Sequence, residues 1–428
     1  MQPISDQIRS ALTGNDTDEI SLVAKKERVS KHFVKRNVAK GRIIILYDRE
    51  RKIEPIGCGV KLRTKVNVNV GTSSLRCDQS RELRRALLAE NYGADRLMDL
   101  STAGDIAALR KRLLTSSHVP LGTVTVYEAC RKAAEKYHSL VDAPDDLFIR
   151  TLEQQVSSGI NYVTIHSDLT YELMKKALRS KRLVKIPARG GALLAGWMLH
   201  NKSENPYYKN FDYICELLGK SDVCLSLGNS LRAGAVCDAL DHVEKEGILA
   251  VGKLMKKTRK IGVQTQVEAG SHIPMSKIES FVNLVKSICK HAPIGTLGPL
   301  VTDIGAGYDH VVQAIGQALG VKAGLDYVTA VTRSEHIGIP SVGDTIEGLV
   351  SARLAVHAGM MARSSFHMKL DIEVSRSRAA IDHERQLQLV FDPETVKKIE
   401  RRQGQTNECS MCGDFCALRM LKDYGKRV

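Results

Sequence analysis

Between Lys65 and Thr332, short apolar runs rich in β-branched residues alternate with longer amphipathic segments. This alternation predicts an α/β fold in which the strands of a parallel sheet are joined by helical crossovers. Nine or so candidate strands over roughly 270 residues favour a closed (β/α)8 TIM-like barrel over an open doubly wound sheet. The candidate strands are VNVNVG, DRLMDLS, GTVTVYEA, YVTIHSDL, RLVKIPARGG, VCLSLGN, VQTQVEAG, IGTLGPLVTD and LDYVTAVT.

The 428 residues exceed one ordinary domain. We expect a small N-terminal domain at residues 1–62, a catalytic barrel at 63–345, and a C-terminal segment at 346–428 that is helical and carries a cysteine-rich tail. The chain does not open with a basic and then apolar leader, and it contains no run of about 18 apolar residues. We therefore expect a cytoplasmic location and no membrane partner.

A formal net charge of +15 raises the alternative of a nucleic-acid-binding or regulatory protein that has lost catalysis. Basic side chains concentrate at residues 25–42 and 256–260. Aromatic residues make up only 5% of the chain, and no recognisable nucleic-acid motif accompanies the basic stretches. We therefore expect a solvated basic surface and no nucleic acid. Positive charge also attracts small anionic substrates such as phosphate esters.

Three of the ten cysteines lie within eight residues near the C-terminus, in NECSMCGDFCALRM: Cys409, Cys412 and Cys416. Three thiolates can hold a [4Fe-4S] cluster and leave one iron open. An open iron can bind S-adenosylmethionine, and electron transfer into its sulfonium releases a 5'-deoxyadenosyl radical. A structural zinc site is the alternative, but it normally needs four ligands, and no histidine or fourth cysteine is nearby.

Long segments of the chain resemble the phosphomethylpyrimidine synthase family, the radical lyases that make the thiamin pyrimidine. The resemblance covers nearly the whole chain. It implies a homodimeric enzyme that works anaerobically on 5-aminoimidazole ribonucleotide with a reducing partner of flavodoxin or ferredoxin type. The matching segments include GVKLRTKVNVNVGTSS (59–74), GADRLMDLS (93–101), LGNSLRAG (227–234), VEAGSHIPM (267–275), TLGPLVTDIGAGYDH (296–310) and SEHIGIP (334–340).

The resemblance also implies a set of substrate contacts at the strand ends. Arg189, Arg232 and the amide of Gly190 can hold phosphate and ribose oxygens. The side chains of Asn69, His166 and Glu268 can hydrogen-bond or exchange protons with the aminoimidazole, and Glu268 is the catalytic candidate. For each residue alone, the alternative is a polar strand end satisfied within the fold. The full set is Asn69, Met98, Tyr127, His166, Arg189, Gly190, Asn229, Leu231, Arg232 and Glu268.

Two histidines, His272 and His336, correspond to the metal ligands of the family. The resemblance implies Zn²⁺, or another divalent metal, at this pair. Two imidazoles leave coordination positions for water or substrate, which suits a catalytic ion better than a structural one. The alternative is two unrelated polar histidines.

The chain departs from the family pattern close to the implied site. EGPGH has become EAGSH at 268–272, DGLRPG has become NSLRAG at 229–234 with the loss of a carboxylate, and a substrate-contacting tyrosine has become Gly295. Lost polar partners shift binding by about 1–3 kcal/mol each, so several together can redirect a rearrangement. The cofactor ligands are retained, which indicates the same radical start and a different product.

These departures favour the 5-hydroxybenzimidazole synthase paralogues, which serve anaerobic cobalamin biosynthesis by making the precursor of the dimethylbenzimidazole lower ligand. The implied course is cluster reduction, radical formation, hydrogen abstraction from the ribose, and insertion of ribose carbons into the imidazole ring, with loss of formate and phosphate. The alternative is the thiamin product, 4-amino-5-hydroxymethyl-2-methylpyrimidine phosphate, from the same substrate.

Overall fold

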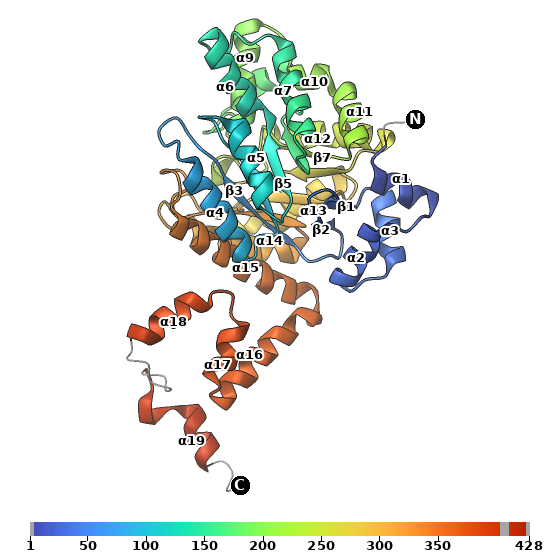
Figure 1. Ribbon diagram of the computed structural model, residues 1–428. Helices are drawn as coiled ribbons and strands as arrows, with labels where there is room; N and C mark the ends of the chain where they lie inside the picture. Colours follow the sequence, from blue (N-terminus) through green and yellow to red (C-terminus); the bar gives the residue numbers. More distant parts are fainter. Residues whose placement is uncertain (1–3, 403–410, 425–428) are drawn as a thin grey trace. The chain divides into compact units, whose positions relative to one another are not determined.

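The computed structural model describes residues 4–402 and 411–424, and its main feature is a closed barrel of eight parallel strands (Figure 1). The strands pair in the order β10-β3-β4-β5-β6-β7-β8-β9. The prediction of a TIM-like barrel is therefore confirmed. The strands are β3 (Lys65–Val70), β4 (Arg96–Asp99), β5 (Leu121–Val124), β6 (Tyr162–Ile165), β7 (Cys224–Gly228), β8 (Thr265–Glu268), β9 (Ile294–Leu297) and β10 (Tyr327–Ala330).

Helices surround the barrel and connect its strands. One predicted strand, RLVKIPARGG at 182–191, is wrong: its first part is irregular and its end begins α9. Pro187 lacks a backbone donor, and Leu183 is 74% exposed, so this run cannot occupy a buried ladder. The helices are α4 (Gln79–Asn91), α5 (Ile106–Ser116), α6 (Thr125–Tyr137), α7 (Asp145–Ser157), α8 (Tyr171–Arg179), α9 (Arg189–Asn201), α10 (Pro206–Lys209), α11 (Phe211–Ser221), α12 (His242–Ile261), α13 (Ile278–Ile288), α14 (Asp309–Ala323) and α15 (Val342–Arg363).

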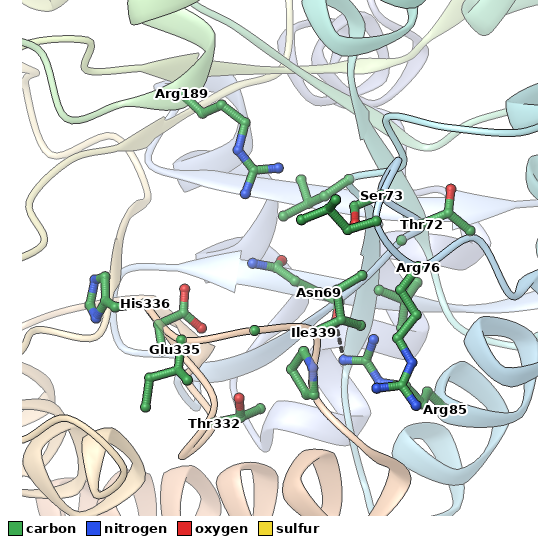
Figure 2. A pocket seen from close by; sticks show the side chains of 17 residues that line it. Asn69, Thr72, Ser73, Arg76, Arg85, Arg189, Thr332, Glu335, His336 and Ile339 are labelled. Carbon is green, nitrogen blue, oxygen red and sulfur yellow. Dashed lines mark hydrogen bonds between the residues drawn. The ribbon is translucent and has the colours of Figure 1, made fainter.

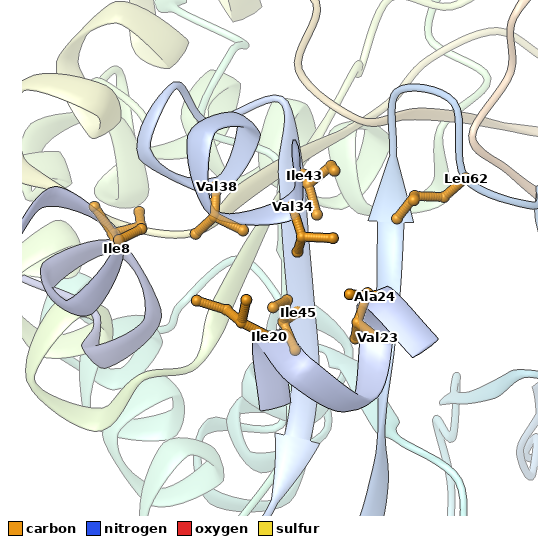
Figure 3. Close-up of a cluster of buried hydrophobic side chains, with 10 residues drawn as sticks. Ile8, Ile20, Val23, Ala24, Val34, Val38, Ile43, Ile45 and Leu62 are labelled. Atoms are coloured by element: carbon orange, nitrogen blue, oxygen red, sulfur yellow. The ribbon is translucent and has the colours of Figure 1, made fainter. Parts of the chain in front are cut away.

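The N-terminal segment packs as a small helical layer on a two-stranded antiparallel sheet. It consists of α1 (Asp6–Thr13), α2 (Asp18–Glu27), α3 (Lys31–Ala39), β1 (Ile43–Asp48) and β2 (Ile53–Gly59). Buried aliphatic side chains such as Ile20, Val34 and Ile45 join the helices to the sheet (Figure 3). Ser30 caps α3 by accepting a hydrogen bond from the amide of Phe33. Removing this apolar area from water drives the packing.

The β1–β2 sheet covers the N-terminal end of the barrel. The side chain of Gln264, directly before β8, accepts from the amide of Ile45 (2.7 Å) and donates to its carbonyl (3.1 Å). The side-chain amide of Asn161, directly before β6, donates to the carbonyl of Tyr47 (2.9 Å). Only the opposite end, where the strands finish, is therefore left for a ligand, as is usual in such barrels.

A buried polar layer fills the middle of the barrel. The guanidinium of Arg96 lies over the ring of Tyr327 (3.8 Å to the centroid) and near that of Tyr162 (4.9 Å), and it donates to Oε1 of Gln266 (2.8 Å). Arg96 is 1% exposed. Such cation–π contacts contribute about 2 kcal/mol or more when they are desolvated.

Two glycines make room for these tyrosine rings. Gly122 pairs with Tyr162 and Gly295 pairs with Tyr327 on the neighbouring strand. A Cβ atom at Gly295 would lie 2.1 Å from the Tyr327 ring. Position 295, where the resemblance implied the loss of a tyrosine, therefore faces a ring of the barrel core in this chain.

Compact packing divides the described chain into two units, residues 1–356 and 357–428. The sequence suggested boundaries at 62/63 and 345/346, where one kind of secondary structure gives way to another. That division stays a proposal. The second unit contains the end of α15 together with α16 (Met368–Ala380), α17 (His383–Leu389), α18 (Pro393–Arg402) and α19 (Ala417–Tyr424). In the described part of the chain, no helix is long and apolar enough to cross a membrane.

Gly295→Ala tests the core arrangement. The added methyl group overlaps the Tyr327 ring, so we expect the free energy of unfolding to fall by about 1–3 kcal/mol. Gly196→Ala in α9 is the matched control, because nothing lies within 4 Å of its added Cβ, and alanine favours helix by up to about 1 kcal/mol. Denaturant titration followed by fluorescence of Trp197, the single tryptophan, measures both. Equal stability of the two variants would contradict the packing described.

Candidate functional site

A cavity of about 350 Å³ opens at the C-terminal ends of the barrel strands. Because side chains alternate along a strand, the residues two positions after the core layer line its floor. Thus Asn69 follows Asn67, Met98 follows Arg96, and Glu268 follows Gln266. The lining side chains include Asn69, Met98, Val124, Tyr127, Thr164, His166, Arg189, Arg232, Glu268, Ser271, His272, Leu297, Thr329, Glu335 and His336.

Seven of the ten substrate contacts expected from the sequence line this one cavity, and three do not. Gly190 lies behind His166, because a Cβ on Gly190 would meet the imidazole Nδ1 at 2.5 Å. Asn229 and Leu231 are fully buried in the loop after β7, where the Asn229 side chain accepts from the amide of Leu231 (3.0 Å). These three residues shape the walls of the cavity and do not line it.

One side of the cavity is suited to an anion. Arg189 is the first residue of α9, and no side chain caps this helix. Its guanidinium lies 5.3 Å from the ring centroid of Tyr127. Free amides and the dipole at a helix start favour a phosphate group. Arg232 enters the same cavity from the loop after β7.

The carboxylate of Glu268 ends β8 and faces Arg232, whose Nη1 donates to Oε1 at 3.3 Å. Both side chains are mostly buried, at 15% and 11% exposure. Asn69 also lines the cavity, and its side-chain Oδ1 accepts from the side chain of Asn67 (2.9 Å), which leaves its side-chain amide hydrogens for a ligand. A carboxylate and an amide donor can therefore contact a heterocycle from below.

His166 follows β6 directly and is 3% exposed. Burial, with a smaller effect from the positive charge of Arg232, lowers the pKa of His166 to about 3. Its Nδ1 has no hydrogen-bond partner among the described residues. A neutral imidazole that lines the cavity can accept from, or donate to, a bound ligand at neutral pH.

His272 and His336 lie together at the rim, with ring centroids 5.4 Å apart. The Nδ1 of His272 lies 2.7 Å from Oδ1 of Asp303, and that of His336 lies 3.8 Å from Oδ1 of Asp309. The Asp303 carboxylate holds one nitrogen of the His272 ring and leaves the other for a metal ion. His336 has φ of 63°, an uncommon conformation for a residue with a side chain. The pair fits a divalent ion, yet no group of three or more candidate ligands gathers within residues 4–402 and 411–424.

A second chamber of about 490 Å³ adjoins the first (Figure 2). It lies between the loop after β3 and the loop after β10, and it shares Asn69, Arg189, Glu335 and His336 with the first chamber. Figure 2 shows the Glu335 carboxylate beside His336 at this junction. The two chambers can therefore hold two ligands side by side.

Two of the three tail cysteines lie in the described part of the chain, and Cys409 lies outside it. Cys412 is exposed, Cys416 is half-buried, and neither forms a disulfide. A short 3₁₀ turn, Gly413–Phe415, separates them, with Gly413 at φ of 48°. Accessible thiols on one turn fit ligation of an iron–sulfur cluster.

Sequence reasoning gave no role to three carboxylates that the structure places at or behind the site. Glu335 and Asp303 lie in segments that matched the family, next to or opposite the histidines. Asp168 lies two residues after His166 and is buried, which raises its pKa to about 7. In the sequence, Glu335 stands next to His336, a candidate metal ligand, and this neighbour could have indicated its role. No feature of the sequence pointed to Asp168.

Comparison with known proteins decides the family. The model of the Radical SAM ThiC family matches residues 6–423. The chain belongs to this family. Membership implies a radical enzyme that uses S-adenosylmethionine and an iron–sulfur cluster, with a small-molecule substrate and a reductant.

Relatives within the ThiC family carry two names. Phosphomethylpyrimidine synthase of Methanocaldococcus jannaschii is 39% identical over 424 residues, which cover 98% of this chain and 100% of the relative. In Moorella thermoacetica, phosphomethylpyrimidine synthase is 40% identical over 422 residues (98% of both chains), and 5-hydroxybenzimidazole synthase BzaB is 41% identical over 421 residues (98% and 99%). Overall identity therefore does not choose between the two reactions.

The lowered pKa of His166 predicts a pH dependence of stability. The unfolded chain takes up a proton at this residue below about pH 6.5, whereas the folded chain does so only near pH 3. This contribution to stability is present above pH 6.5 and is lost as the pH falls from there toward 3. Between pH 7.5 and 5.5, the free energy of unfolding should fall by about 1 kcal/mol more in the wild type than in His166→Gln. Parallel pH profiles would show that folding does not lower the pKa of His166.

Proposed function

We propose that this protein is a radical S-adenosylmethionine lyase that converts 5-aminoimidazole ribonucleotide to 5-hydroxybenzimidazole. The carrying observation is the single cavity that combines two arginines and a helix start on one side with His166, Asn69 and Glu268 on the floor and wall. The arginines match a phosphate, and the other groups match a hydrogen-bonding heterocycle.

The residues of the cavity then have separate tasks. Arg189 and Arg232 bind the phosphate and ribose oxygens. His166, which is neutral, and Asn69 orient the aminoimidazole by hydrogen bonds. Glu268 accepts or returns a proton on the ring, and its ion pair with Arg232 keeps the carboxylate in place.

The adjoining chamber is the proposed place for S-adenosylmethionine. Its walls offer Asn69 and Glu335 toward the first chamber and backbone from the loop after β3. When bound, the cluster supplies the electron that cleaves the sulfonium and generates the 5'-deoxyadenosyl radical. We propose Cys409, Cys412 and Cys416 as its ligands, with His272 and His336 as ligands of a divalent metal such as Zn²⁺. A flavodoxin or ferredoxin is the proposed reductant, and a homodimer the proposed assembly.

The core layer beneath the cavity supports the choice of product. At Gly295, the space of the family's tyrosine is filled by the ring of Tyr327, whose hydroxyl donates to the carbonyl of Val267 (2.9 Å). That hydroxyl is therefore engaged inside the barrel. A ligand above loses one donor that the thiamin enzymes supply, which favours a changed outcome.

The second candidate is phosphomethylpyrimidine synthase, since relatives across nearly the whole chain carry that name. It uses the same residues on the same substrate, and it differs in the rearrangement that follows hydrogen abstraction. Only the product distinguishes the two.

Product analysis tests the proposal. Anaerobically reconstituted and reduced protein is incubated with 5-aminoimidazole ribonucleotide and S-adenosylmethionine, and the products are identified by mass and fluorescence. We expect 5'-deoxyadenosine, formate and fluorescent 5-hydroxybenzimidazole. Cys412→Ala is the control, because it removes an exposed thiol of the tail, and it should yield none of these. Hydroxymethylpyrimidine phosphate as the product would overturn the choice in favour of the second candidate.

A further inference from the structure

A buried carboxylate lies directly behind the substrate cavity. Asp168 turns away from the cavity toward Ser230 in the loop after β7. Its Oδ2 accepts from the Ser230 amide (2.7 Å), and its Oδ1 accepts from the Ser230 hydroxyl (2.6 Å). Asp168 is 1% exposed and Ser230 is fully buried. Both oxygens of the carboxylate are therefore committed to one residue of the neighbouring loop.

That loop, residues 229–233, carries Arg232 into the cavity. Other groups hold its two ends: the amide of Asn229 donates to the carbonyl of Glu268 (2.8 Å), and that of Ala233 donates to Oε1 of Glu244 (2.9 Å). Between these anchors, Ser230 bonds Asp168 two residues before Arg232, and the guanidinium of Arg182 donates to the carbonyl of Leu231 (2.9 Å). The Ser230–Asp168 contact is therefore one of the side-chain contacts that hold the backbone leading to Arg232.

Ser230 also supports the start of α9. A Cβ at Gly191 would lie 2.7 Å from the Cβ of Ser230, so the first turn of the helix rests directly on this residue. Arg189 begins the same turn. Ser230 thus contacts both Asp168 and the first turn of α9. One residue therefore touches both segments that carry the arginines of the proposed phosphate site, Arg189 and Arg232.

The family pattern DGLRPG has an acid where this chain has Asn229. Asp168 brings a carboxylate to the next residue of the same loop from the neighbouring strand end. The carboxylate that contacts Ser230 in this loop therefore comes from Asp168, in the loop after β6.

We propose that Asp168 is a positioning residue that acts through Ser230 to hold Arg232, and with it the start of α9, in the geometry that binds the phosphate of the ribonucleotide. This inference rests on the proposed function for the identity of the ligand. It assigns Asp168 no contact with that ligand.

A double-mutant cycle tests it. The dissociation constant of 5-aminoimidazole ribonucleotide is measured by calorimetry on the full chain for the wild type, Asp168→Ala, Arg232→Ala and the double variant. We expect Asp168→Ala to weaken binding about tenfold in the wild-type background, since lost buried partners cost about 1–3 kcal/mol. In the Arg232→Ala background, it should weaken binding less than about twofold, because the group it positions is gone.

A conservative variant separates positioning from general damage. In Asp168→Asn, the carboxamide oxygen still accepts from the Ser230 amide, and its nitrogen donates to the hydroxyl. We expect affinity within about threefold of the wild type. If Asp168→Ala does not fold, Ser230→Ala takes its place in the cycle, with an expected loss of about threefold that again disappears without Arg232.

Asp99→Ala is the matched control. Asp99 ends β4 and accepts from the amide (2.9 Å) and hydroxyl (2.5 Å) of Ser101, which is the same kind of buried contact on another side of the barrel. Asp99→Ala should change the dissociation constant by the same factor in the wild type and in the Arg232→Ala variant. The same additivity for Asp168, or no effect of Asp168→Ala on affinity, would overturn the inference. A wild type that binds the ribonucleotide but forms neither product contradicts the proposed reaction alone.

Discussion

The guanidinium of Arg96 is the group on which the site is built. It lies in the centre of the barrel without a carboxylate contact among the described residues, held by the faces of two tyrosines and one glutamine oxygen. Burying an unpaired charge is expensive, so the layer around it must be closely matched. That layer requires glycine at 122 and 295, and the next layer forms the cavity floor. The position of the cavity floor therefore depends on the packing of the layer around Arg96.

The sequence predicted the architecture because the strand–helix rhythm is a local property. Eight of the nine apolar runs are strands, and the run at 182–191 failed because Pro187 and a glycine pair interrupt it. Placing polar residues at strand ends was also sufficient to predict a shared site, since all strands of a parallel barrel finish at the same rim. Seven implied contacts do line one cavity.

Pairing across the barrel could not be predicted from the sequence. Nothing local shows that Tyr327 fills the space above Gly295, that Arg96 lies between two rings, or that Asp168 bonds Ser230 across 62 residues. Gly190 was predicted as a contact through its backbone amide, and the sequence did not indicate that its missing side chain leaves room for His166. Such relations depend on register and closure, which periodicity does not encode.

The central claim is that the strand-end cavity binds the ribonucleotide with its phosphate at the arginines and its ring over the floor. A crystal structure of the full chain, prepared anaerobically with 5-aminoimidazole ribonucleotide, tests this most directly. The account predicts phosphate oxygens within hydrogen-bonding distance of Arg232 and the first amides of α9, and the imidazole next to His166, Asn69 and Glu268. Ligand density with the phosphate away from both arginines, or outside the barrel mouth, would contradict it.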